Sequence, residues 1–331
     1  MFIVASIDAN SREIVTSAPG KLMLFGEHSV VYGHPCIVTA VDQRIEVRLQ
    51  KNGVDVFHMS APDLGLEAYS KTIEDLGKKQ LPKAVRFVEM LYKRFLEKYP
   101  QKEGVVGVTR SDFSSKFGFG SSSAVTVAFA KALVSLYGVE VSNKELFDMC
   151  YRAVIDVQGV GSGFDLAAAI WGGTIYYVSP AKVVEQLEID ELPVVVGYTG
   201  VKADTTTLVH LVKGLKDREP EMVEGVFSEI TGLVEEAKDA IKEKDWEKVG
   251  EIMNENEELL EKLGVGSVEL DKLIKSCLDV RAWGAKLSGA GGGDCMLAVG
   301  GSALELESAV SEVGGEVMRV GLNAEGVRAE S

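Results

Sequence analysis

The sequence predicts an α+β protein of two domains. Strand-like and helix-like segments are mixed in the first half, whereas long charged amphipathic helices follow a change of character near Leu192. A length of 331 residues is enough for two domains. We therefore expect an N-terminal domain over residues 1–185 and a C-terminal domain over 186–331. The boundary should fall between about Pro180 and Pro193.

Strands and helices can be expected along the whole chain from periodicity and from helix-breaking residues. In the first half, β-branched or alternating residues predict strands at 14–26, 43–50, 104–111 and 172–179, and helical spacing predicts helices at 83–99, 121–137 and 143–157. In the second half, we expect a buried strand at 192–200, helices at 221–244, 246–264 and 268–284, a strand–turn–strand at 285–299 and closing strands at 314–330.

Composition and charge restrict the class of partner. Hydrophobic residues make up 46% and charged residues 26%, which is typical of a soluble globular protein. The net charge of −15 argues against general binding to nucleic acid or to an anionic membrane, because both favour basic patches. No window approaches 18 apolar residues, and no secretory signal is recognisable at the start. Four cysteines without a C-x-x-C pair indicate buried reduced thiols and a cytoplasmic protein.

The stretch KFGFGSSSAV, residues 116–125, has the composition of a phosphate-binding turn. Gly118 and Gly120 precede three serines and a predicted helix start, where free N–H groups and the positive end of the helix dipole favour an anion. The stretch is not the common nucleotide loop, because no lysine follows the last glycine. A tight turn whose helix is capped by a serine is the alternative interpretation.

Polar residues interrupt two other apolar or glycine-rich stretches. Lys21, Glu27 and His28 lie in the run APGKLMLFGEHSVVYG, which suggests groups facing a cleft, although an exposed turn would explain them equally. The run SGAGGGDC contains four glycines within five residues. Close approach of the backbone to a ligand would require them, and so would a bend between two strands.

Asp165 is the candidate general base. It follows a glycine–serine turn and precedes small apolar residues, where a carboxylate needs a partner. Lys21 is a plausible partner, and such a pair can take a proton from a hydroxyl and stabilise a transferring phosphoryl group. An N-cap aspartate is the alternative.

Along the chain the four motifs are the lysine run, the serine loop, the aspartate after its glycine–serine turn and the glycine-rich run, and in this order they resemble those of the GHMP small-molecule kinases. The resemblance runs from the lysine segment to the end of the chain. It implies phosphoryl transfer from ATP with Mg²⁺. It also implies a ribosomal-S5-like N-terminal domain, a ferredoxin-like C-terminal domain and a site between them.

The resemblance assigns roles to individual residues. Asp165 matches the catalytic aspartate, Lys21 its lysine neighbour, and Ser122 a serine that ligates Mg²⁺. The residues matching the ATP phosphate loop are Gly118, Phe119, Gly120, Ser121, Ser122 and Ser123. The expected substrate-binding residues are Glu27, His28, Lys116, Gly289, Ala290 and Gly291.

The motifs resemble two branches of the family that differ in the acceptor they phosphorylate. The first motif resembles mevalonate kinases, whereas Lys116 in front of the loop resembles phosphomevalonate kinases. Mevalonate kinases usually carry a metal-ligating glutamate where this chain has Val154, so the metal would depend on Ser122, water and the ATP phosphates. We expect a small-molecule acceptor, either mevalonate or 5-phosphomevalonate. A non-catalytic metabolite-binding protein is the alternative from another class, and a homodimer is one option for the assembly.

Overall fold

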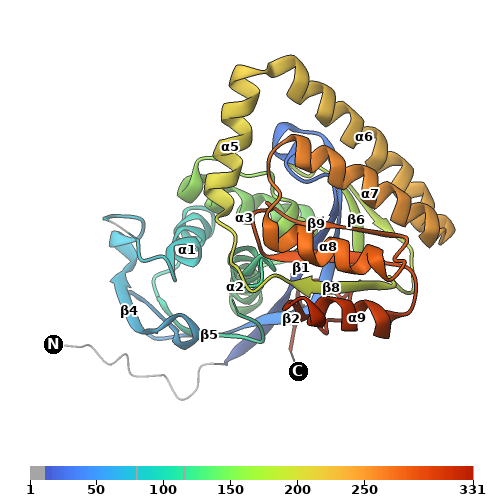
Figure 1. The fold of residues 1–331 in the computed structure, drawn as a ribbon. Helices are drawn as coiled ribbons and strands as arrows, with labels where there is room; N and C mark the ends of the chain where they lie inside the picture. The colour runs from blue at the N-terminus through green and yellow to red at the C-terminus, as the bar shows by residue number, and fades with distance from the viewer. Residues whose placement is uncertain (1–11, 80, 115, 331) are drawn as a thin grey trace.

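Two sheets organise the chain in the computed structural model, which describes residues 12–79, 81–114 and 116–330 (Figure 1). The larger sheet has eight strands in the order β12-β1-β2-β5-β3-β4, with β6 pairing with both β2 and β7. Its strands are β1 (Ile14–Phe25), β2 (Pro35–Lys51), β3 (Val56–Ala61), β4 (Leu66–Thr72), β5 (Val105–Ser111), β6 (Thr174–Val178), β7 (Val183–Leu187) and β12 (Arg328–Ala329).

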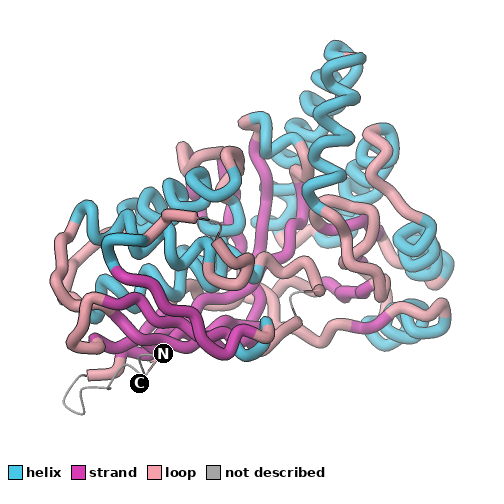
Figure 2. The backbone as a smooth tube through the Cα atoms, turned by 90° about the vertical axis from the view of Figure 1, so that its left-hand side faces the viewer, coloured by secondary structure: helices cyan, strands magenta, loops and turns pink. Residues whose placement is uncertain are grey.

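Four helices pack on one face of this sheet. They are α1 (Arg86–Lys98), α2 (Ser121–Leu136), α3 (Asn143–Gln158) and α4 (Phe164–Trp171). Side chains alternate along the strands as a period of two requires. Met23 and Val38 belong to a hydrophobic core shared with these helices, while Leu22 and Ile37 belong to a second core shared with residues of the C-terminal half of the chain. Figure 2 shows the strands of this sheet in magenta beneath the cyan helices.

The second sheet has four strands in the order β11-β8-β10-β9. Its strands are β8 (Val194–Tyr198), β9 (Gly284–Ser288), β10 (Cys295–Val299) and β11 (Glu316–Val317), and its helices are α5 (Thr205–Arg218), α6 (Pro220–Glu243), α7 (Trp246–Lys262), α8 (Val268–Asp279) and α9 (Ala303–Glu312). Short 3-10 helices occur at Ser29–Tyr32, Pro62–Leu64 and Ile73–Asp75. Helices α5 and α6 form the apex of the molecule in Figure 1.

The C-terminal segment returns to the first sheet. Strand β12 pairs with β1 through Thr16 and Ser17, whereas β11 pairs with β8 of the second sheet. The buried guanidinium of Arg44 donates to the carbonyl oxygens of Glu325 and Gly326 and thereby fixes this segment. The closing strands expected at 314–330 therefore belong to two different sheets.

The fold class is confirmed, with several elements added to the predicted ones. Each predicted strand and helix is present, although β2 begins at Pro35, eight residues before its expected start, whereas β3, β4, β7, α4, α5 and α9 were not predicted. Because β7 pairs with β6, the change of sheet falls after Leu187, two residues beyond the end expected for the first domain.

The four cysteines are free and buried, as predicted. Among the described residues, no helix is long and apolar enough to cross a membrane.

Candidate active site

Lys21 and Asp165 form an ion pair at the centre of the site. The Nζ atom of Lys21 lies 3.5 Å from Oδ1 of Asp165 and donates a hydrogen bond of 3.1 Å to the carbonyl oxygen of Gly118. It also lies 5.3 Å from the ring centroid of Phe164. The pair expected from the sequence is therefore present. It joins the lysine segment, the serine loop and the aspartate helix at one point.

Asp165 is placed in the first turn of α4. The N-cap of that helix is Gly163, with φ of 81°, so Asp165 is not the capping residue that the alternative interpretation required. A carboxylate in the first turn lies at the positive end of the helix dipole. The side chain is 34% exposed, while its Oδ1 is inaccessible and accepts no hydrogen bond from the described residues. One side of the carboxylate is thus open to a substrate hydroxyl.

Three hydroxyl groups hold the turn that precedes Asp165. The buried Tyr177 donates a hydrogen bond of 2.6 Å to the carbonyl oxygen of Ser162, and Ser179 donates one of 2.8 Å to the same oxygen. Tyr151 donates a hydrogen bond of 2.8 Å to the carbonyl oxygen of Gly161. The position of the carboxylate therefore depends on side chains from β6, α3 and the residue after β6.

The start of α2 is an uncapped helix end that faces this ion pair. Its N-cap is Gly120, with φ of 73°, and no side chain caps the helix, so the serine-cap alternative does not occur. A Cβ on Gly120 would lie 3.2 Å from side-chain carbons of Lys21 and 3.6 Å from Oδ1 of Asp165. The orphan N–H groups of a helix start, its dipole and a lysine together suit an anion.

The glycine-rich loop after β9 packs closely on two neighbouring segments. A Cβ on Gly291 would lie 2.0 Å from the carbonyl oxygen of Val265, and one on Gly293 would lie 2.6 Å from that of Val201. Gly289 has φ of 104° and faces open space instead. Packing thus explains the later glycines, and the open position at the start of the loop is the one that can approach a ligand.

His28 connects this loop to the lysine segment. Its Nε2 lies 2.9 Å from the carbonyl oxygen of Ala290, so Nε2 carries the proton and donates. Burial lowers the pKa of the His28 imidazole, partly offset by this hydrogen bond. The ring is therefore expected to be neutral near pH 7, with Nδ1 as an acceptor.

Glu27 lies behind the cleft rather than in it. Its side chain has no exposed surface and forms an ion pair with Lys286, which is equally buried. The nearby carboxyl of Glu257 accepts a hydrogen bond of 2.8 Å from the N–H of Leu287. Burial raises the pKa of Glu257 to about 7, with Lys286 opposing and Glu27 adding to the shift. Glu27 cannot contact a substrate in this arrangement, contrary to its predicted substrate-binding role.

Asp294 closes the other side of the serine loop. Its Oδ1 accepts a hydrogen bond of 2.9 Å from the N–H of Ala203, and its Oδ2 lies 2.6 Å from the position of a Cβ on Gly118. Burial raises the pKa of the Asp294 carboxyl, while the positive charges of Lys21 and Lys202 lower it. Glycine is required at 118 because this carboxylate occupies the space of a side chain.

Lys116 and the other candidate phosphate-binding cations differ in their exposure. Lys116 is exposed, and so are Arg110 and Lys202. Arg44 is buried, and its guanidinium donates to Ser17 and to the C-terminal segment. Arg44 is therefore unavailable to a substrate phosphate.

The residues that could hold a divalent cation are few. Val154 is packed in the helix-layer core, and Asp156 forms a bidentate ion pair with Arg94 at 2.6 and 2.7 Å. In the described part of the chain, no group of three or more His, Cys, Asp or Glu side chains could hold a metal ion. Ser122 is exposed at the start of α2, and the side chain of Asp165 is 34% exposed although its Oδ1 is buried against Lys21. Two oxygen donors beside a polyphosphate are a donor set that Mg²⁺ accepts, because it keeps several waters.

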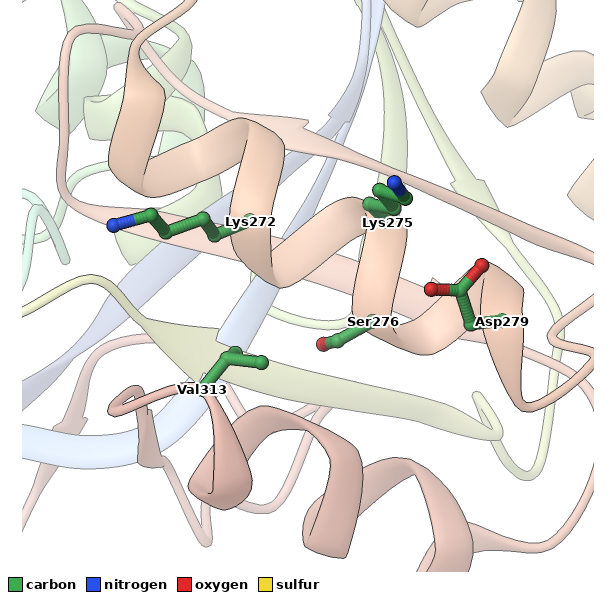
Figure 3. Close-up of a pocket in the computed structure, with 5 residues that line it drawn as sticks. All are labelled: Lys272, Lys275, Ser276, Asp279 and Val313. Atoms are coloured by element: carbon green, nitrogen blue, oxygen red, sulfur yellow. The ribbon is translucent and has the colours of Figure 1, made fainter.

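A separate hollow of about 380 Å³ lies away from these residues (Figure 3). Its lining consists of Lys272, Lys275, Ser276, Asp279 and Val313. These belong to α8 and to the end of α9, which carry none of the predicted site residues.

The residues missed from the sequence are Lys286, Glu257, Asp294 and Tyr177. A lysine within the apolar strand AKLS was the one usable signal, since Lys286 is a charged residue in a fully buried segment. The other three act through tertiary contacts that local patterns do not specify.

Family models match both halves of the chain. The model described as GHMP kinases N terminal domain matches residues 84–173, and the model described as GHMP kinases C terminal matches residues 237–317. The first match contains the serine loop and Asp165. The second contains Lys286 and the glycine-rich loop.

Known proteins match nearly the whole chain. The mevalonate kinase of Pyrococcus abyssi is 36% identical over 335 aligned residues, which cover 96% of this chain and 98% of that protein. The solved mevalonate kinase of Methanococcus jannaschii has a TM-score of 0.78 and 23% identity, covering 95% of this chain and 99% of its own. The Streptococcus pneumoniae phosphomevalonate kinase has a TM-score of 0.76 and 20% identity, covering 93% and 99%. The two structures share the fold with this chain to a similar degree.

Proposed function

Because this chain belongs to the GHMP kinase family, we propose that it transfers the γ-phosphoryl group of ATP to the C5 hydroxyl of mevalonate, giving 5-phosphomevalonate. The observation that carries the proposal is the Lys21–Asp165 ion pair at the uncapped start of α2. A base for the hydroxyl, a cation for the developing charge and a phosphate-binding helix start meet there. A kinase needs these three parts to be adjacent.

Each part has a defined task. The carboxylate of Asp165 accepts the proton of the hydroxyl, and Lys21 stabilises negative charge on the phosphoryl oxygens. Gly118, Gly120 and the serines after them surround the ATP phosphates at this helix start, where the N–H of Ser123 already donates to the carbonyl oxygen of Gly120. His28 and the segment Gly289–Gly291 border the acceptor, and the loop excludes water that would otherwise hydrolyse ATP.

A divalent cation fits this donor set. Ser122 would hold Mg²⁺ together with the nucleotide phosphates, and the cation would neutralise part of their charge. The position of Val154 contributes no ligand because its side chain is apolar and buried. The remaining coordination would come from water.

Mevalonate is favoured over its phosphate for two reasons. Relatives that are 35–36% identical over 98% of their own length are described as mevalonate kinases. In addition, Arg44 is committed to structural contacts. A phosphate on the acceptor would need charge-assisted donors, and Arg44 is not available as one.

A coupled assay of ADP release tests the proposal. The enzyme is incubated with ATP and Mg²⁺, in parallel with mevalonate, with 5-phosphomevalonate and with no acceptor. We expect ADP release with mevalonate at a rate far above the other two. Release with 5-phosphomevalonate alone would reassign the chain to the phosphomevalonate kinases, and release with neither would favour the metabolite-binding alternative or another alcohol.

A further inference from the structure

Three links tie the end of β9 and the loop after it to the segment that follows Lys21. Lys286 is paired with Glu27. The hydroxyl of Ser288 accepts from the N–H of Met23 at 3.1 Å and donates to its carbonyl oxygen at 2.8 Å. The imidazole of His28 bonds the carbonyl oxygen of Ala290 at 2.9 Å. Alternate residues of one segment thus contact the other, and the two sheets meet along this line.

Lys286 and Glu257 also complete the free edge of β9. Among the described strands, β9 pairs with β10 alone, so the backbone groups of Leu287 face away from the sheet. The carbonyl oxygen of Leu287 accepts from Nζ of Lys286 at 2.6 Å, and its N–H donates to Glu257 at 2.8 Å. Asn254, one helical turn earlier on α7, accepts a hydrogen bond of 3.1 Å from the N–H of Ala285 through its Oδ1 atom. The strand that leads into the glycine-rich loop is therefore held by side chains along its outer edge.

Burial of the charged side chains of Glu27, Glu257 and Lys286 between the two sheets costs desolvation free energy. One oxygen of Glu27 and one of Glu257 are buried and have no hydrogen-bond partner in the described structure. Two carboxyls and one ammonium are removed from water together, and a buried ion pair of this kind adds little net stability compared with apolar residues of similar volume. What it can fix is the register of one segment against the other.

We propose that Lys286 and Glu27 are positioning residues for the acceptor side of the site. Resting on the proposed function, the inference is that their ion pair sets His28 and the Ala290 segment relative to Lys21, without either residue contacting the acceptor. Glu27 precedes His28 directly, and Lys286 stands four residues before Ala290. Loss of the pair should loosen the acceptor pocket while leaving the start of α2, which lies on another segment, in place.

A double variant that removes both charges of the Glu27–Lys286 pair separates positioning from folding. Lys286→Met alone leaves Glu27 buried and unpaired, and should lower Tm strongly. Glu27→Gln with Lys286→Met removes both charges and should recover most of that loss. We expect the double variant to show a KM for mevalonate at least about tenfold above wild type, with the KM for ATP within about threefold. Recovery of the mevalonate KM together with Tm would show that the pair is only structural, and would overturn the proposal.

The single variant Glu27→Gln is judged by the same two KM values if the double variant does not fold. Failure of both to fold would also overturn the proposal, because the pair would then be required for the fold itself. The matched control is Glu89→Gln with Lys71→Met, an ion pair at 2.7 Å between α1 and β4 in which Glu89 is fully buried and Lys71 is 13% exposed. Its mevalonate KM should stay at the wild-type value, and a similar rise in this control would contradict a specific role.

Hydrogen exchange gives a readout that does not depend on the acceptor. In the double variant, amides of residues 26–29 and 289–293 should exchange at least about tenfold faster, with those of α2 unchanged. Unchanged exchange in the two segments would contradict the proposal even if the substrate were not mevalonate. Inactivity of the wild-type enzyme with mevalonate would instead contradict the proposed function alone.

Discussion

The Nζ atom of Lys21 lies 3.5 Å from Oδ1 of Asp165, and the two residues come from the first strand and a helix that begins 143 positions later in the chain, at Phe164. Gly118, from a third segment, accepts a hydrogen bond from the same Nζ atom. The chemistry of the site therefore depends on the relative positions of the three segments that carry Lys21, Gly118 and Asp165.

Asp165→Asn should lower kcat by about 10²–10⁴-fold, because the amide cannot accept the proton of the hydroxyl. The fold should persist, since the side chain is partly exposed. Steady-state ADP release and a thermal melt measure both effects. Asp156→Asn is the control: that carboxylate pairs with Arg94 outside the site, and its loss should leave kcat unchanged. Near-normal turnover of Asp165→Asn would show that the base is another group.

Gly118→Ala should both destabilise the protein and raise the KM for ATP. The residue has φ of 71°, and its new Cβ would lie 2.6 Å from Oδ2 of Asp294. Gly138 has φ of 65° with nothing within 4 Å, so Gly138→Ala isolates the backbone cost of about 1 kcal/mol. Denaturant titration and the KM for ATP compare the two variants. Equal destabilisation with unchanged KM values would mean that Asp294 can move aside freely.

Tyr177→Phe should lower kcat by about threefold to tenfold with little change in the KM for ATP. The hydroxyl donates to Ser162 in the turn before Asp165, and small displacements of a catalytic group are costly in rate. Tyr137→Phe is the control, because its hydroxyl bonds the carbonyl oxygen of Glu103 at 3.2 Å, away from that turn. If Ser179 alone holds the Ser162 carbonyl adequately, both variants will show wild-type kcat and the assigned role of Tyr177 is wrong.

Glu257→Gln should remove a pH dependence of stability. Burial raises the pKa of this carboxyl to about 7 in the folded protein, from an ordinary value of 4.5, against the opposing charge of Lys286 and with Glu27 and Glu261 adding to the shift. The folded state holds the proton more tightly, so stability from this group is present below pH 4.5 and is lost as pH rises through 7, by about 3 kcal/mol.

Denaturant titrations at pH 5 and pH 8 check this sign. The wild-type protein should lose more free energy of unfolding than Glu257→Gln on going from pH 5 to pH 8. The glutamine retains an acceptor for the N–H of Leu287, so the comparison isolates the charge. Parallel pH profiles of the two proteins would show that Glu257 titrates normally.

Helices and central strands could be predicted from the sequence because their signals are local. The apolar spacing of α1, bounded by Pro82 and Pro100, and the alternation in β1 each specify one element without reference to the rest of the chain. Strand β4 was missed because it lies at the edge of the sheet and carries exposed polar residues. Strand β3 pairs with β4 and β5, but its run of six residues is too short to give a strong local signal. The destination of β12 depends on Arg44, a partner almost 300 residues away.

The candidate site shows the same division. Lys21, Asp165 and the glycines could be recognised from motif order, and the ion pair between the first two is present. The structural role of Glu27 could not be recognised from the sequence. Its neighbours in sequence suggest a cleft, whereas its ion-pair partner, Lys286, lies in another sheet. Burial of a charge is decided by the tertiary partner, and a single sequence does not name that partner.

The return of the C-terminal segment to β1 has a consequence for synthesis on the ribosome. Strand β1, which carries Lys21, gains its outer neighbour β12 only after every strand of the second sheet has emerged. The nascent N-terminal half therefore cannot complete its own sheet, and an exposed strand edge is available to other chains during that interval. The N–H of Lys21 bonds the carbonyl oxygen of Phe119 early, so the unprotected edge of β1 comprises the residues around Thr16 and Ser17 and also Met23, whose backbone groups await Ser288 of the second sheet.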